Sequence, residues 1–140
     1  YKPSLVTNVG VRIPAHLTAS GRSMLAGLPA AQVRALYPDR ASFASRWEST
    51  AITTPGQLRA ELERTRSRGW SEEEGDVTPN FASVAVAAHD HRGLPVAGVA
   101  LTFLGHKIDD ERRAELVGHV RRTAEALTRR LHGAVPAGGG

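Results

Sequence analysis

The stretch FASVAVAAHDHRGLPVAGVALTF, residues 81–103, decides the fold class. Residues 81–88 and 94–103 are rich in valine, alanine and other small or β-branched side chains, a composition typical of strands. Between them, the segment His89-Asp90-His91-Arg92-Gly93 has the composition of a tight turn. The stretch therefore predicts a β-hairpin, and its nearly continuous apolar strands predict burial on both faces.

Helices are predicted on both sides of this hairpin. Before it, Thr54-Pro55-Gly56-Gln57 combines a capping box with proline at the first helical position, and the helix that it starts should end at Gly69. After it, apolar residues recur every three or four positions as far as Leu131, which predicts a long last helix that Asp109 or Asp110 can cap.

Three further elements are predicted nearer the N-terminus: a β-like opening segment over 5–13, a helix over about 19–28 and a short helix over 30–36. The order of strand, helices, strands and helix predicts a single α+β domain, residues 1–133, around a mainly antiparallel sheet. Residues 134–140 are glycine-rich with one proline, and we expect them to be disordered.

Composition excludes several function classes. Eighteen lysines and arginines against fourteen acidic residues give a net charge of +4, and these charges are mixed along the predicted helices. Such mixing is typical of solvated helix faces and argues against a nucleic-acid-binding stripe. The absence of cysteine excludes disulfides, thiolate zinc sites and cysteine nucleophiles. No apolar run is long enough to cross a membrane, so we expect a cytoplasmic protein without membrane contacts.

The start of the first predicted helix is a candidate binding site. Thr18 and Ser20 are both plausible N-caps, and Ala19, Ser20 and Gly21 are small enough for a ligand to approach the backbone. N–H groups at a helix start have no partner within the helix, and the helix dipole adds positive charge there. The site suits a carboxylate, a phosphate or a carbonyl oxygen, although an ordinary capped helix explains the same residues.

Polar residues in the predicted strands are further candidates. If residues 70–74 are extended, Glu73 points away from the face that Glu72 and Glu74 share, and it could contact a ligand. Three solvated carboxylates are the alternative. Ser83 and Thr102 interrupt apolar strands, and a buried hydroxyl needs a partner, which is either a backbone carbonyl or a ligand.

Two patterns that resemble metal or catalytic sites are better explained as structure. His89 and His91 would share one face of a strand and could bind a divalent cation. They lie beside Arg92 at the tip of the hairpin, however, which favours a solvated turn. His16 and Ser20 suggest a base and a nucleophile, but no G-x-S-x-G motif accompanies them. We therefore expect no metal, no cofactor and no enzymatic activity.

The chain resembles the effector-binding domain of the IclR family of bacterial transcriptional regulators. No single motif carries the resemblance, which rests on the order and spacing of several short ones between Leu5 and Leu131: Gly10-Val11-Arg12, His16, Ala19-Ser20-Gly21-Arg22, Leu58 with Glu61-Leu62, Arg66-Ser67-Arg68-Gly69-Trp70, Val77-Thr78-Pro79, Ala82-Ser83-Val84-Ala85 and Asp90-His91-Arg92-Gly93.

The resemblance implies a GAF-like α+β fold, in which a curved, mainly antiparallel sheet packs with helices and a long C-terminal helix, around a pocket for a small molecule. It places the candidate effector-binding residues at Ala19, Ser20, Gly21, Glu73, Ser83, Ala100 and Thr102. Two of these depart from the family pattern. Glu73 stands where aspartate is usual, and Ala100 lacks a hydroxyl, which favours an effector larger or more apolar than glyoxylate.

The predicted function is therefore that of a ligand-sensing domain. It would bind a small carboxylate or aromatic effector and shift the operator binding of a homo-oligomer, a dimer or a tetramer. Operator DNA would be bound by an N-terminal winged helix-turn-helix domain that is absent from this chain. The alternative is a GAF-like dimerisation or sensory module with a vestigial pocket, which the lost hydroxyl at Ala100 favours.

Overall fold

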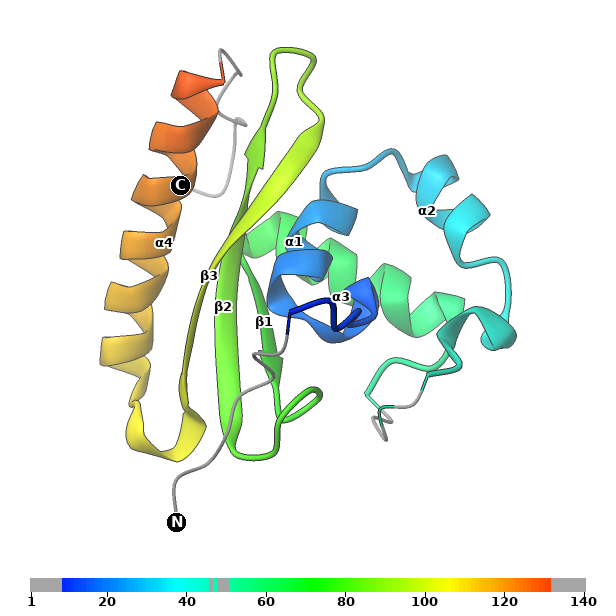
Figure 1. Ribbon diagram of the computed structural model, residues 1–140, viewed down its shortest axis with the longest axis horizontal. Helices are drawn as coiled ribbons and strands as arrows, with labels where there is room; N and C mark the ends of the chain where they lie inside the picture. Colours follow the sequence, from blue (N-terminus) through cyan, green and yellow to red (C-terminus); the bar gives the residue numbers. More distant parts are fainter. Residues whose placement is uncertain (1–8, 46, 48–50, 132–140) are drawn as a thin grey trace.

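The centre of the molecule is an antiparallel sheet of three strands in the order β1-β2-β3 (Figure 1). β1 is Ser71–Glu74, β2 is Phe81–His89 and β3 is Pro95–Leu104. The computed structural model describes residues 9–45, 47 and 51–131. β2 and β3 pair along their whole length, with one register irregularity between Ala88 and His89. The predicted hairpin is thus confirmed.

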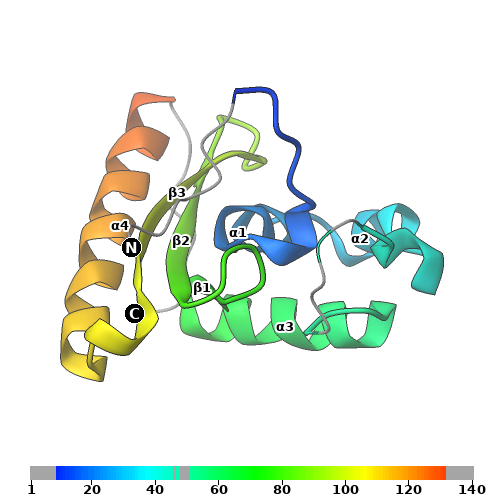
Figure 2. The ribbon, with the colours of Figure 1, turned by 60° about the horizontal axis from the view of Figure 1, so that its bottom comes forward.

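Helices cover both faces of the sheet (Figures 1 and 2). α4, Asp110–Arg130, lies on one face, and α1, Ala19–Ala26, and α3, Pro55–Arg68, lie on the other. α2, Ala30–Leu36, lies beyond α1, away from the sheet. In the described residues, three 3₁₀ turns complete the fold: η1 at Ala15–Leu17, η2 at Arg40–Phe43 and η3 at Gly105–Lys107. The predicted α+β fold class and the long last helix are confirmed.

The helix boundaries follow from local capping. Thr18, Thr54 and Asp109 each accept a hydrogen bond from the N–H three residues further on, at 2.9, 3.2 and 2.7 Å, and so cap α1, α3 and α4. Gly69 ends α3 in the left-handed region, with φ of +83°. The sequence predicts Thr54 and Gly69 directly, and the structure selects Thr18 over Ser20 and Asp109 over Asp110.

The sheet separates two apolar clusters. Val84 of β2 points toward α4 and packs with Val117 and Val120. The neighbouring Ser83 lies on the opposite face of the strand, because side chains alternate along β-structure. The second cluster joins α1, α2 and α3, and its buried members are Leu25, Val33, Phe43, Ile52, Leu58 and Leu62.

α1 lies unusually close to the hairpin at both of its ends. A Cβ placed on Gly98 of β3 would lie only 2.8 Å from the Ser20 Cβ, so only glycine allows this approach. At the other end, a Cβ on Gly27 would lie 3.2 Å from His89 Nε2 and 3.3 Å from Pro95 Cγ. The two glycines thus set the distance between α1 and the sheet.

Two expectations are wrong for the described residues. The expected opening segment is a turn and irregular chain over 9–14, with Gly10 at φ +87°, and its first residues lie outside the described part. β3 is not buried on both faces, since Val96 and Leu101 are 47% and 39% exposed. The reason is that β3 is an edge strand of the described sheet. The expected disordered tail, 134–140, lies outside the described residues.

Candidate functional site

A cavity of about 230 Å³ lies between the N-terminal end of α1 and the sheet. The residues that line it come from the loop before α1, from α1, from all three strands and from the β1–β2 connection. They are Ile13, Thr18, Ala19, Ser20, Glu73, Val77, Thr78, Phe81, Ser83, Ala100 and Thr102. The structure therefore brings all the predicted site residues together in one cavity, with the exception of Gly21.

Gly21 has a packing role instead. A Cβ at this position would lie 2.1 Å from the Ala15 carbonyl oxygen, which is a severe clash. Its N–H donates to the Thr18 hydroxyl, so it is not free to meet a ligand. By contrast, the N–H groups of Ala19 and Ser20 have no acceptor among the described residues. These two donors, at the positive end of the helix dipole, belong to residues that line the cavity.

Glu73 is the one charged residue in the described cavity lining, and its side chain is only 5% exposed. It faces the cavity from β1, opposite Ser83 of β2, while Glu72 on the other face pairs with Arg113 of α4 at 3.3 Å. The alternation predicted for the acidic triplet is therefore correct. Glu73 Oε2 accepts a hydrogen bond from the Asp76 N–H at 3.1 Å.

Burial raises the pKa of the Glu73 carboxyl above its ordinary value, and the nearby Asp76 carboxylate acts in the same direction. Hydrogen bonds from the Asp76 backbone and the Ser83 hydroxyl, together with the charge of Arg22, offset part of this rise in pKa. The Glu73 carboxyl therefore releases its proton less readily than an exposed glutamate does.

The Ser83 hydroxyl also contacts Thr102. The two residues are cross-strand partners on β2 and β3, and their hydroxyl oxygens are 2.8 Å apart. Three further hydroxyls in the described lining belong to Thr18, Ser20 and Thr78, and the hydroxyl of Thr18 caps α1. No lysine, arginine or histidine is among the described residues that line the cavity. The lining thus offers hydroxyls, one carboxyl group and backbone donors, but no cation.

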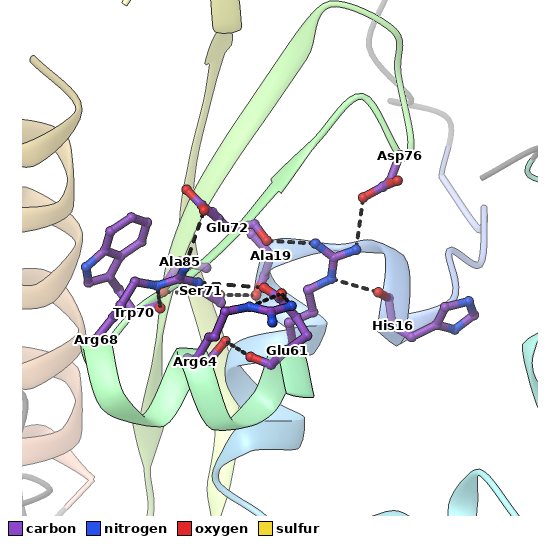
Figure 3. A network of polar contacts seen from close by, with 12 residues as sticks. His16, Ala19, Glu61, Arg64, Arg68, Trp70, Ser71, Glu72, Asp76 and Ala85 are labelled. Carbon is purple, nitrogen blue, oxygen red and sulfur yellow. Dashed lines mark hydrogen bonds and ion pairs between the residues drawn. The ribbon is translucent and has the colours of Figure 1, made fainter. Parts of the chain in front are cut away.

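Arg22 holds the walls of the cavity together, and sequence reasoning missed it. Its side chain is 5% exposed and makes three strong contacts (Figure 3). Nε donates to the His16 carbonyl at 2.8 Å, Nη1 to the Glu72 carbonyl at 2.7 Å, and Nη2 pairs with Asp76 at 2.9 Å. These contacts attach α1 to η1, to β1 and to the β1–β2 connection that carries Val77 and Thr78.

The two patterns set aside in the sequence do not form reactive sites. The His16 ring is 3% exposed and packs edge-on against Phe43 and Tyr37, with centroid distances of 5.1 and 5.9 Å. No hydrogen bond joins His16 to Ser20 within the part of the chain that the structure describes. Burial, and then the charge of Arg22, lowers the His16 pKa, which keeps the ring neutral.

At the hairpin tip, Asp90 Oδ1 accepts hydrogen bonds from the N–H groups of Arg92 and Leu94, at 2.8 and 3.0 Å. This is a turn stabilised by its own aspartate, as the sequence predicted. The described residues contain no cluster of three or more His, Cys, Asp or Glu side chains that could hold a metal ion.

Comparison with known proteins places this geometry in a family. Residues 1–129 match the family model described as "Bacterial transcriptional regulator IclR C-terminal". The chain belongs to the IclR family. The sequence resemblance is therefore confirmed, and the matched IclR-family proteins are named as regulators and repressors rather than enzymes.

Two IclR-family relatives illustrate the degree of similarity. The glycerol operon regulatory protein of Streptomyces coelicolor is 34% identical over 128 residues, which cover 90% of this chain and 49% of that protein. The transcriptional repressor IclR of Escherichia coli is 25% identical over 120 residues, covering 86% and 43%. The chain thus spans about half the length of the curated relatives it matches.

Solved structures of the IclR family share the fold. The Thermotoga maritima IclR structure superposes with a TM-score of 0.82 at 28% identity, over 94% of this chain and 53% of that chain. The Agrobacterium tumefaciens repressor BlcR gives a TM-score of 0.81 at 31% identity, over 91% of this chain and 51% of that chain.

Among the described residues of the present chain, no helix combines the length and the apolar character needed to cross a membrane.

Proposed function

We propose that this chain is the ligand-sensing part of a transcriptional regulator and that its effector binds in the cavity between α1 and the sheet. The observation that carries the proposal is the buried Glu73 carboxyl facing a cavity whose opposite wall is the start of α1. A buried carboxyl that faces an open cavity, rather than a salt-bridge partner, is typical of a binding site.

The chemistry of the lining favours an uncharged, hydroxylated effector of the polyol class. The hydroxyls of such a molecule donate to Glu73, and their oxygens accept from the N–H groups of Ala19 and Ser20. A carboxylate effector would bring a second negative charge beside Glu73, with no cation in the described lining to balance it. We therefore favour a polyol, and the carboxylate or aromatic effector expected from the sequence is the alternative to test.

The names of two relatives point in the same direction. Both are called glycerol operon regulatory proteins, and they are 34% and 33% identical to this chain over 128 residues. Those names describe proteins from Streptomyces coelicolor and Streptomyces griseus. They support glycerol as the first polyol to test here.

Effector binding would act on DNA through the position of α1. A ligand held between Glu73 and the start of α1 favours one distance between the helix and the sheet, and a coupling of ~1–3 kcal/mol suffices for regulation. In a cytoplasmic dimer or tetramer, this change would alter the spacing of winged helix-turn-helix domains on the operator.

Calorimetric titration with glycerol and with glycerate, which replaces one CH₂OH group by a carboxylate, tests the proposal. Glycerol is expected to bind more tightly than glycerate. The Glu73→Gln variant is expected to lose about tenfold in glycerol affinity, because it loses a charged acceptor, and to gain affinity for glycerate. The matched control is Glu74→Gln, on the opposite and exposed face of β1, which should change neither affinity.

Polyols also stabilise proteins by being excluded from the surface, so thermal shifts alone do not report on the site. That general effect is common to the parent protein and the Glu73→Gln variant, and only the difference between them measures site binding. If neither compound binds, or if Glu73→Gln leaves both affinities unchanged, the polyol assignment is wrong. A cavity that binds no small molecule at all would favour the dimerisation module with a vestigial pocket.

A further inference from the structure

A second cavity, of about 220 Å³, lies between α2 and α3. None of the residues that line it also lines the effector cavity. Figure 1 shows α2 on the side of α1 that is remote from the sheet and from α4. The lining residues are Ala30, Val33, Arg34, Tyr37, Pro38, Pro55, Leu58, Arg59, Leu62, Glu63 and Arg66.

The floor of this cavity is apolar and part of the core. Val33 of α2 is 8% exposed, and Leu58 and Leu62 of α3 are each 1% exposed. All three belong to the apolar cluster that includes Leu25 of α1. Because these three side chains are buried, an apolar group of a ligand that entered here would contact the more accessible lining residues Tyr37, Pro38 and Pro55 and be removed from water against them.

The rim of the cavity carries an excess of positive charge. Arg34 extends from α2, and Arg59 and Arg66 extend from α3, whereas Glu63 is the one acidic residue in the described lining. Arg66 Nε donates to the Ala26 carbonyl at 2.9 Å. Arg34 and Arg59 form neither an ion pair nor a hydrogen bond with any described residue.

Other arginines of α3 do form ion pairs. Outside the cavity lining, Arg64 and Arg68 of α3 both pair with Glu61, at 2.7 and 3.6 Å. The guanidinium groups at the cavity rim therefore retain their full capacity to bind an anion. A planar guanidinium binds a carboxylate through two parallel hydrogen bonds.

We propose that the α2–α3 cavity is a second ligand site, which takes a small amphipathic carboxylate. The apolar body of the ligand, a phenyl ring or a branched alkyl group, lies against Tyr37, Pro38 and Pro55, and its carboxylate is held by Arg34 and Arg59. The two cavities then have opposite preferences, since the first presents a carboxyl group without a cation and the second presents cations over an apolar floor.

Titration of the purified protein with benzoate, monitored by calorimetry at low ionic strength, tests this site. Two probes isolate the two parts of the ligand: benzyl alcohol has the ring without the charge, and acetate has the charge without the ring. Benzoate is expected to bind at least tenfold more tightly than either. The double variant Arg34→Gln/Arg59→Gln is expected to lose at least tenfold in benzoate affinity.

Two control variants locate the effect. Arg129→Gln/Arg130→Gln removes the same charge from the exposed C-terminal end of α4, and should leave benzoate binding unchanged. Glu73→Gln alters the first cavity and should also leave it unchanged, so this site and the effector site succeed or fail independently. The proposal is overturned if benzyl alcohol or acetate binds as tightly as benzoate, if either control weakens benzoate as much as the double variant does, or if benzoate does not bind.

Discussion

Replacement of Arg22 by methionine tests whether this side chain stabilises the structure around the cavity between α1 and the sheet. Methionine keeps much of the aliphatic volume of the side chain but removes the guanidinium group. The Asp76 side chain, 11% exposed, then loses its ion pair with Arg22 at 2.9 Å, and the carbonyls of His16 and Glu72 each lose a charged donor. The variant therefore leaves one buried charge and two backbone acceptors without Arg22.

The magnitude follows from these losses. Removal of one partner of a buried ion pair destabilises a protein by about 3–5 kcal/mol. Each buried acceptor left without a donor adds about 1 kcal/mol or more. The sum, about 5–7 kcal/mol, is comparable with the whole stability of many domains, so Arg22→Met is expected to be close to unfolding in water.

Urea denaturation, monitored by circular dichroism, measures this loss of unfolding free energy. The matched control is Arg64→Met, which breaks an ion pair on the surface of α3 where the arginine is 59% exposed, and which should cost at most ~1 kcal/mol. Asp76→Asn keeps an oxygen acceptor and is expected to fall between the two variants. The reasoning is refuted if Arg22→Met and Arg64→Met have the same stability, or if Asp76→Asn is the least stable of the three.

Three further predictions concern pH and packing. Because the folded-state pKa of Glu73 is raised, ionisation of this carboxyl opposes folding as pH rises above its unfolded pKa. The Glu73→Gln variant should therefore be more stable than the parent at pH 7, and urea titrations should show this difference in stability disappear by pH 4. The lowered pKa of His16 makes the parent lose stability as pH falls below about 6.5, so His16→Phe should reduce the loss between pH 7 and pH 5, while replacement of the exposed His106 by glutamine should not. Gly21→Ala should cost at least ~1–3 kcal/mol in unfolding free energy, because its Cβ meets the backbone of Ala15, whereas Gly56→Ala in the open first turn of α3 should raise the thermal midpoint slightly.

Much of the fold could be predicted from local patterns, because the signals involved act over a few residues. The caps at Thr18, Thr54 and Asp109 depend on hydrogen bonds to the third residue that follows. The inward orientation of Glu73 depends only on the alternation of side chains along a strand. The resemblance to the IclR family implies pocket positions at Ala19, Ser20, Ser83, Ala100 and Thr102, and these residues line one cavity in the structure.

The features that escaped prediction depend on contacts between distant parts of the chain. Arg22 meets Asp76 across 54 positions, and no periodicity in the sequence records that an arginine in the middle of a helix is buried. The exposure of Leu101 reflects the position of β3 at the edge of the described sheet, which the composition of a strand does not determine. The cavity between α2 and α3 also depends on how two helices pack, although its arginines are visible in the sequence.

Ser20 and Gly98 bring the first turn of α1 close to β3, so a tilt of α1 about this contact would displace the two ends of the helix by different amounts. Ala19, which lines the cavity between α1 and the sheet, is next to Ser20. Gly27 is seven residues after Ser20, about 10 Å along the helix axis. A tilt of α1 at the cavity would therefore give a larger displacement at this far end, where a Cβ on Gly27 would lie 3.2 Å from His89 Nε2 and 3.3 Å from Pro95 Cγ. Such a displacement would reach the sheet at His89 and Pro95, where β2 ends and β3 begins.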